Sequence, residues 1–192
     1  MRRLSRFFVP NLICDSVFDL PKKYLGGKKI RAIIFDIDNT LAPYDAPRPD
    51  EKTVEFLKGL EEKGIKIVLV SNNSPERVEE FNRDLGFFCV PDAHKPKKEA
   101  LKPALEYLKG IKRKRILLVG DQLLTDVFVA KRNRLRAVVV HPIKKKENWF
   151  FRLKRRLEKP FINEYHELKK KKKQEKRQRK KEQKLRSKEV DR

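Results

Sequence analysis

The sequence predicts a doubly wound α/β domain, in which helices cover both faces of a parallel sheet. Four short apolar runs support this fold class, at residues 30–35, 65–70, 116–119 and 137–140. Most positions in each run are apolar consecutively rather than alternately, which is typical of strands that are buried on both faces. Helical patterns separate the runs, as expected for a sheet built from strand–helix–strand units.

Capping residues mark the helices that follow the first two runs. One helix is expected from Pro49 to Gly64, because proline favours the first turn of a helix and glycine favours its end. The next is expected to begin with Ser74 as N-cap and Pro75 in the first turn, and to end before Gly86. Further helices are expected at residues 97–109, 125–133 and 149–157, and a short strand is expected at 87–90.

Length and charge divide the chain into a domain and a tail. The 192 residues fit one domain, which we expect over residues 1–162, followed by a basic tail over 163–192. Lys169 to Arg192 contains fourteen lysines and arginines and only four acidic residues. With almost no apolar residue to bury, this tail is expected to be a solvated helix or disordered. The formal net charge of +23 indicates an anionic partner.

The sequence also indicates a cytoplasmic protein. Only two cysteines occur, Cys14 and Cys89, too few for a disulfide framework. The longest apolar stretches are about six residues, whereas a membrane-spanning helix needs about 20. The apolar run near the N-terminus stops at Pro10, short of a signal-peptide core. The apolar residues from Phe7 to Phe18, and those at 149–151, are expected either to cover the core or to lie in a membrane interface.

Polar side chains collect at the predicted carboxyl ends of the strands, where open α/β sheets bind their ligands. Asp36 and Asp38 follow the first strand. Residues two apart on an extended segment project to the same side, so both carboxylates can reach one small ligand. The other candidate residues lie after the later strands or before the third helix: Ser71, Asn72, Lys95, Gly120, Asp121 and Asp126.

These residue types together predict a phosphoryl-transfer site. Several neighbouring carboxylates repel one another unless they share a cation, and Mg²⁺ prefers oxygen ligands. A lysine and a hydroxyl group then supply positive charge and hydrogen bonds for phosphoryl oxygens. A receiver domain gathers similar groups, but its phosphoacceptor follows a later strand, which here ends in Ser71. A serine hydrolase is disfavoured because no GxSxG motif surrounds Ser71.

Four motifs carry a family resemblance: FDIDNTL at 35–41, VSNN at 70–73, KP at 95–96 and GDQLLTDV at 120–127. In this order they resemble the motifs of the haloacid dehalogenase superfamily of phosphatases. The residues within these motifs are most similar to those of the YqeG branch of subclass IIIA, which is related to the mitochondrial phosphatidylglycerophosphatase. The resemblance covers about residues 5 to 160 and implies a haloacid dehalogenase-like Rossmannoid core without a cap domain.

The resemblance also implies roles for individual residues. Asp36 corresponds to the nucleophile that becomes an aspartyl-phosphate, and Asp38 to the general acid and base. Ser71 and the amide of Asn72 would bind a phosphoryl oxygen, while Lys95 would neutralise charge. The implied Mg²⁺ ligands are Asp36, Asp38 through its backbone carbonyl, and Asp121; the implied supporting residues are Thr40, Gly120 and Asp126.

Without a cap domain the active site would be open, which suits a lipid headgroup, a polymer or a protein. The resemblance implies an Mg²⁺-dependent phosphomonoesterase that converts phosphatidylglycerophosphate to phosphatidylglycerol. We expect it at the inner face of the membrane, with the basic tail on anionic lipid. Two alternatives stay open: a phosphatase acting on a nucleic-acid or ribosome-associated substrate, and a basic nucleic-acid-binding protein with an idle core. The sequence gives no indication of the oligomeric state.

Overall fold

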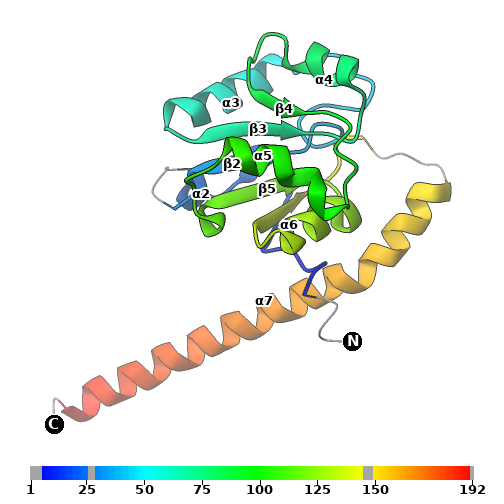
Figure 1. Cartoon of the computed structure of the whole chain (residues 1–192). Helices are drawn as coiled ribbons and strands as arrows, with labels where there is room; N and C mark the ends of the chain where they lie inside the picture. The colour runs from blue at the N-terminus through cyan, green and yellow to red at the C-terminus, as the bar shows by residue number, and fades with distance from the viewer. Residues whose placement is uncertain (1–5, 26–28, 145–148, 191–192) are drawn as a thin grey trace.

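A computed structural model describes residues 6–25, 29–144 and 149–190, and its centre is one parallel sheet (Figure 1). The strand order is β1-β6-β5-β2-β3-β4, and all five pairings are parallel. The predicted fold class is therefore confirmed. The strands are β1 (Leu12–Cys14), β2 (Ala32–Phe35), β3 (Lys66–Val70), β4 (Phe88–Val90), β5 (Ile116–Gly120) and β6 (Arg136–Val140).

Helices cover both faces of the sheet. The α-helices are α2 (Lys22–Leu25), α3 (Glu51–Glu62), α4 (Pro75–Asn82), α5 (Lys102–Tyr107), α6 (Phe128–Arg132) and α7 (Trp149–Val190). On one face, Leu57 of α3 and Phe81 of α4 belong to the same core cluster as Phe35. On the other face, residues of α5 and α6 belong to the same core cluster as Ile34. Neighbouring residues of β2 therefore enter opposite halves of the core, which explains the continuous apolar run.

Two of the predicted helices are interrupted. Residues 97–109 form a 3₁₀-helix (Lys98–Leu101) followed by α5, with Pro103 in the first turn of α5. Proline has no N–H to continue the preceding ladder of hydrogen bonds, so a new helix begins there. Residues 125–133 were expected to form one α-helix, but a single-turn π-helix (Leu123–Val127) precedes α6.

The N-terminal apolar segment covers the core. Strand β1, which the sequence analysis did not predict, extends the sheet beside β6. Val17 is buried, and Phe8 stacks on Phe128 with 4.7 Å between ring centroids. Of the two expectations for this segment, the packed arrangement is the one found. Three residues are too few to give a strand a recognisable pattern, so only the pairing with β6 reveals β1.

Helix α7 runs without a break from Trp149 to Val190, through Pro160, and projects beyond the α/β domain (Figure 1). The predicted boundary between residues 162 and 163 falls inside this helix. Contacts with the domain extend at least to Tyr165, which is buried and whose hydroxyl accepts a hydrogen bond from the Ile13 amide at 3.2 Å. The side chains described from 169 onward are exposed, and those of 149–151 lie outside the described part. None of the described helices combines the length and apolar character needed to cross a membrane.

Candidate active site

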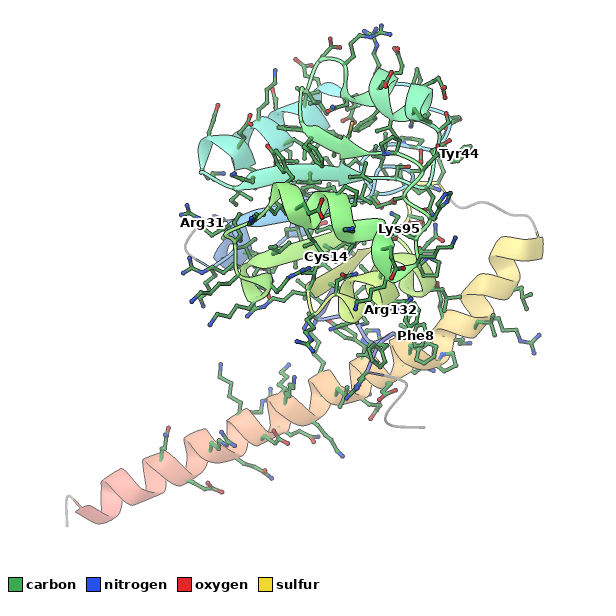
Figure 2. All side chains as sticks on the ribbon, viewed as in Figure 1. Phe8, Cys14, Arg31, Tyr44, Lys95 and Arg132 are labelled. Carbon is green, nitrogen blue, oxygen red and sulfur yellow. The ribbon has the colours of Figure 1, made fainter. Side chains whose placement is uncertain are left out.

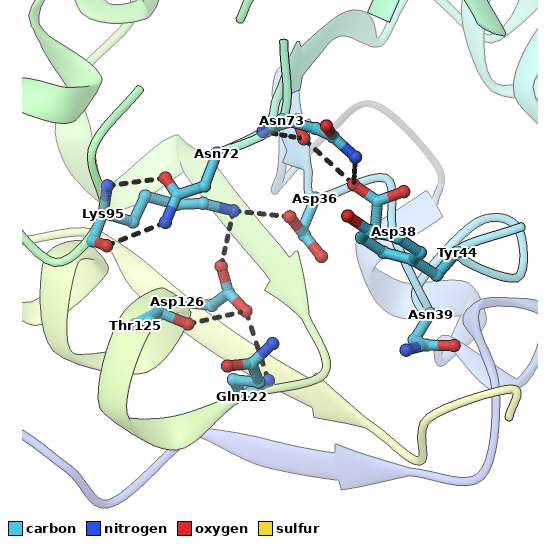
Figure 3. A pocket seen from close by; sticks show the side chains of 11 residues that line it. Asp36, Asp38, Asn39, Tyr44, Asn72, Asn73, Lys95, Gln122, Thr125 and Asp126 are labelled. Atoms are coloured by element: carbon cyan, nitrogen blue, oxygen red, sulfur yellow. Dashed lines mark hydrogen bonds and ion pairs between the residues drawn. The ribbon is translucent and has the colours of Figure 1, made fainter. Parts of the chain in front are cut away.

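The carboxyl ends of β2, β3 and β5 meet around a cavity of about 230 Å³ (Figure 3). Most of the sequence-predicted residues lie together here, although they come from distant parts of the chain. The lining residues are Asp36, Asp38, Asn39, Tyr44, Ser71, Asn72, Asn73, Lys95, Gln122, Thr125 and Asp126. Asp121 and Gly120 adjoin this set at the end of β5.

Lys95 is the buried centre of the charged network. Its Nζ donates to Asp36 Oδ1 at 2.5 Å, to Asp126 Oδ1 at 2.8 Å and to the Val70 carbonyl oxygen at 3.0 Å. Burial by itself lowers the pKa of Lys95, but the carboxylates of Asp126 and Asp36 outweigh it and hold this pKa above its usual value. Lys95 is therefore a fixed positive charge at the floor of the cavity.

Asn72 positions Lys95. Its Nδ2 donates to the Lys95 carbonyl oxygen at 2.8 Å, and its Oδ1 accepts from the Lys95 amide at 2.7 Å. The motif predicted a phosphate-binding role for the Asn72 backbone amide but none for its side chain. The two residues are 23 positions apart, and no local pattern signals such a pairing.

Three carboxyl groups form an acidic cluster. Asp36, Asp121 and Asp126 each place an oxygen within 4.8 Å of the others. Asp121 Oδ1 is buried, and within the described part of the chain no group donates a hydrogen bond to it. One lysine charge cannot balance three carboxylates. A buried oxygen facing two other acids is a suitable ligand for a divalent cation, so these residues fit Mg²⁺.

The same surroundings shift two acidic pKa values upward. Burial raises the pKa of Asp36 to about 7, with Asp126 adding to the shift and Lys95 opposing it. Burial also raises the pKa of Asp121 to about 8, assisted by Asp36 and Asp126. Without a cation, Asp36 and Asp121 are therefore partly protonated near neutral pH.

The carboxylate of Asp38 lies outside the acidic cluster. It accepts hydrogen bonds from Ser71 Oγ at 3.2 Å and Asn73 Nδ2 at 3.4 Å, and forms an ion pair with Arg77 at 3.2 Å. Of the predicted ligands, Asp38 thus contributes no carboxylate to the acidic cluster, whereas Asp126, predicted as a supporting residue, does. Coordination through the Asp38 backbone carbonyl stays a prediction.

Arg77 is a site residue that the sequence did not reveal, and Asn73 belongs to the VSNN motif but had no predicted role. Arg77 lies in α4, 39 positions from Asp38, and its Nη1 also donates to the Pro47 carbonyl oxygen at 3.1 Å. It thereby links α4 to the loop after β2. The contact between Arg77 and Asp38 depends on how α4 packs. In the sequence, the position of Arg77 in the first turn of the helix after Ser71 was the feature that could have indicated it.

Thr40 and Gly120 support the acids. Thr40 Oγ1 donates to Asp36 Oδ2 at 3.0 Å and so fixes the second oxygen of this carboxylate. At Gly120, an added Cβ would lie 2.6 Å from the Asp126 Cβ and closer still to its carboxyl group. Only glycine allows Asp126 to approach β5 in this way.

Gly120→Ala should therefore weaken Mg²⁺ binding by about 10-fold or more, because Asp126 must move away from Asp36 and Asp121. The measurement is the Mg²⁺ concentration that gives half-maximal phosphatase activity. Gly59→Ala is the matched control, since a Cβ there has no neighbour within 4 Å and alanine favours helix α3. Equal Mg²⁺ requirements in the two variants would contradict the packing role of Gly120.

Comparison with known proteins agrees with this geometry. Residues 41–133 match the family model of haloacid dehalogenase-like hydrolases. The probable phosphatase YqeG of Bacillus subtilis strain 168 is 32% identical over 160 residues, which cover 83% of this chain and 92% of that protein. The chain belongs to the haloacid dehalogenase superfamily. The family match begins at Leu41 and does not include Asp36 and Asp38, whose roles stay predictions.

Solved structures of similar proteins include two described as 3-deoxy-D-manno-octulosonate 8-phosphate phosphatases. The putative one from Vibrio cholerae is 18% identical with a TM-score of 0.49, covering 62% of this chain and 79% of that chain. The one from Moraxella catarrhalis, described with magnesium and phosphate ions and the KDO molecule, is 17% identical with a TM-score of 0.44, covering 77% of this chain and 95% of that chain.

Proposed function

We propose that this haloacid dehalogenase-type phosphatase is an Mg²⁺-dependent phosphomonoesterase whose nucleophile is Asp36. The observation that carries the proposal is the convergence of Asp36, Asp38, Ser71 and Lys95 on one cavity beside the acidic cluster. Lys95 and Thr40 fix the two oxygens of Asp36, so a carboxylate is oriented toward the space where a phosphoryl group would enter. Such preorganisation is the main protein contribution to phosphoryl transfer.

Asp36, Asp121 and Asp126 are the side chains that would hold Mg²⁺, with the Asp38 backbone carbonyl as the further predicted ligand. Bound Mg²⁺ would screen the negative phosphoryl group from Asp36 and stabilise charge on its oxygens. The unpartnered Asp121 Oδ1 supports this placement, and so do the pKa values of Asp36 and Asp121, which burial and then the neighbouring carboxylates raise. Members of the superfamily typically use Mg²⁺.

The reaction would proceed in two displacements. An Asp36 oxygen attacks phosphorus, the bond from phosphorus to the ester oxygen breaks, and protonated Asp38 donates its proton to the leaving alkoxide. Asp38 then accepts a proton from water, whose oxygen attacks phosphorus while the bond to Asp36 breaks and inorganic phosphate forms. Ser71 Oγ and the Asn72 amide would bind phosphoryl oxygens, and Lys95 would offset their charge.

The proposed substrate is phosphatidylglycerophosphate, converted to phosphatidylglycerol. Between Thr40 and Ser71 the chain holds only a loop, α3 and β3, and between Ser71 and Lys95 only α4 and β4. These segments, all described, contain no inserted cap domain. Tyr44 at the cavity is half exposed, so a headgroup attached to a membrane could approach from this side. The basic helix α7 would attract anionic lipid and hold the enzyme at the inner face of the membrane.

The test is phosphate release from three substrates: phosphatidylglycerophosphate in mixed micelles, a 5′-phosphorylated oligonucleotide and a small aryl phosphate. Asp36→Asn measures the background for each one. We expect Mg²⁺-dependent release with a strong preference for the lipid. Preference for the oligonucleotide would favour the nucleic-acid alternative, while activity on the aryl phosphate alone would retain the chemistry and reject the lipid substrate.

Deleting Lys169 to Arg192 should weaken binding to anionic vesicles while leaving hydrolysis of the aryl phosphate unchanged. The deleted residues lie beyond Tyr165, and each basic residue near an anionic surface contributes about 1 kcal/mol. Co-sedimentation with vesicles of anionic and of zwitterionic lipid measures the effect. Equal sedimentation of full-length and shortened protein on anionic vesicles would assign the tail to another partner.

A further inference from the structure

Helix α7 carries a buried carboxylate that contacts the π-helical turn Leu123–Val127, which contains Asp126. Glu158 is only 8% exposed, and its Oε1 accepts hydrogen bonds from the amides of Leu123 at 2.9 Å and Leu124 at 3.3 Å. A buried carboxylate is costly unless its oxygens receive hydrogen bonds. The first amides of a helical turn need such acceptors, because they have no partner within the turn. Glu158 and these two amides therefore satisfy one another.

The two amides belong to the turn that presents the acidic cluster. Leu123 and Leu124 open the π-helical turn Leu123–Val127, which begins two residues after Asp121 and contains Asp126. A π-helical turn adds a residue to a helix, and such turns occur frequently at functional sites. Within it, Asp126 Oδ2 accepts from the Gln122 amide at 3.2 Å, so the chain folds back and brings Asp126 toward Asp121.

The position of Glu158 is fixed by the packing of α7. Phe161, one turn along the helix, stacks on Phe8 with 4.8 Å between ring centroids, and Phe8 stacks in turn on Phe128 of α6. Figure 2 shows Phe8 beside α7. Tyr165, two turns along, receives the hydrogen bond from the Ile13 amide that ties α7 to β1. Aromatic stacking and a buried hydrogen bond thus hold this part of α7 against the domain.

We propose that Glu158 is a positioning residue for the Mg²⁺ site. It holds the turn from Leu123 to Val127 in the conformation that brings Asp126 beside Asp36 and Asp121. The inference rests on the proposed function for the identity of the ion. It gives α7 a part in the active site, although α7 lies outside the four motifs and none of its described side chains lines the cavity.

The test compares Mg²⁺ binding in wild type, Glu158→Ala, Glu158→Gln and the control Glu167→Ala. Glu167 lies on the same helix but is exposed, and it forms a surface ion pair with Lys170. Isothermal titration with Mg²⁺ gives the dissociation constant, and the thermal midpoint is measured with and without Mg²⁺. Groups that orient metal ligands typically change metal affinity by about 10-fold to 100-fold.

We expect Glu158→Ala to weaken Mg²⁺ binding by about 10-fold and to reduce the Mg²⁺-induced rise of the thermal midpoint. Glu158→Gln keeps an acceptor oxygen without the charge, so its Mg²⁺ dissociation constant should lie between those of Glu158→Ala and wild type. If Glu158→Ala does not fold, Glu158→Gln carries the test. Glu167→Ala should match wild type. The proposal would be overturned if both Glu158 variants kept the wild-type Mg²⁺ dissociation constant while their thermal midpoints fell equally with and without Mg²⁺. Glu158 would then have a merely structural role. Wild type that binds no Mg²⁺ would instead overturn the proposed metal site itself.

Discussion

Asp36→Asn should lower kcat at saturating Mg²⁺ by about 10⁴-fold or more and leave the protein folded. An amide has nearly the same shape as the carboxylate but is not nucleophilic, so no bond from this side chain to phosphorus can form. The amide oxygen of the variant can still accept the hydrogen bond from Lys95, which preserves the packing of the network. Steady-state hydrolysis of an aryl phosphate measures the loss, and circular dichroism checks the fold.

A control variant at Thr40 distinguishes the loss of the nucleophilic carboxylate from the loss of a hydrogen bond that orients it. Thr40→Val removes the hydrogen bond to Asp36 Oδ2 but keeps both the carboxylate and the side-chain volume, so its loss should be about 10-fold or less. Acid quenching during turnover should trap a phosphorylated wild-type protein and none with Asp36→Asn. If the asparagine variant retained activity within about 10-fold of wild type, Asp36 would not be the nucleophile.

Lys95→Met should lower both activity and stability. The neutral side chain no longer offsets the phosphoryl charge, which should reduce kcat by about 10²-fold to 10³-fold. It also leaves Asp36 and Asp126 without the ammonium group that bonds to both. Removing one partner from a buried charge network costs about 3–5 kcal/mol. Urea unfolding in the absence of Mg²⁺ should therefore show a large loss in the free energy of unfolding at pH 8.

The loss in the free energy of unfolding of Lys95→Met should be smaller at pH 5 than at pH 8. Burial holds the pKa of Asp36 at about 7 and that of Asp121 at about 8, above their usual values, so the folded protein retains protons that the unfolded chain releases. The resulting stabilisation is complete below the usual aspartate range and is lost as pH rises through 7 and 8. Lys95 lowers the pKa of both acids, so its removal raises these pKa values further. The Lys95→Met variant should therefore be least stable at high pH, where the acids ionise.

Lys97→Met is the control for a lysine in the same segment, because Lys97 is exposed. It should unfold like wild type at both pH values, since exposed charges contribute little to stability. Equal unfolding free energies for the Lys95 and Lys97 variants at pH 8 would mean that Lys95 does not balance the buried acids.

Much of the candidate site could be predicted because its residues sit at positions that local patterns reveal. Asp36 and Asp38 follow a strand whose apolar run is unmistakable, and Ser71 and Asp121 stand at equivalent points of two other strands. In a parallel sheet the carboxyl ends of neighbouring strands lie side by side. Predicting the strands was therefore enough to predict that these side chains meet.

The contacts that orient those residues could not be predicted in the same way. Arg77 reaches Asp38, Asn72 holds Lys95, and Glu158 binds the amides after Asp121, across separations from 23 to 39 residues. Each depends on the angle at which a helix or loop packs, and no sequence spacing encodes such an angle. The same holds for β1, whose three residues become a strand only beside β6.

By itself the sequence determined the strands β2 to β6, the positions of the longer helices between them, and the set of acids, lysine and hydroxyl groups at the strand ends. Apolar periodicity and strand-end positions are local properties, which is why they could be predicted. Only the tertiary structure decided which acids form the cluster. It placed the Asp126 carboxylate beside Asp36 and Asp121 and turned the Asp38 carboxylate toward Arg77. The physical reason is that a π-helical turn, whose first amide donates to Glu158 of α7, brings Asp126 inward, into space that the absence of a Cβ at Gly120 leaves free.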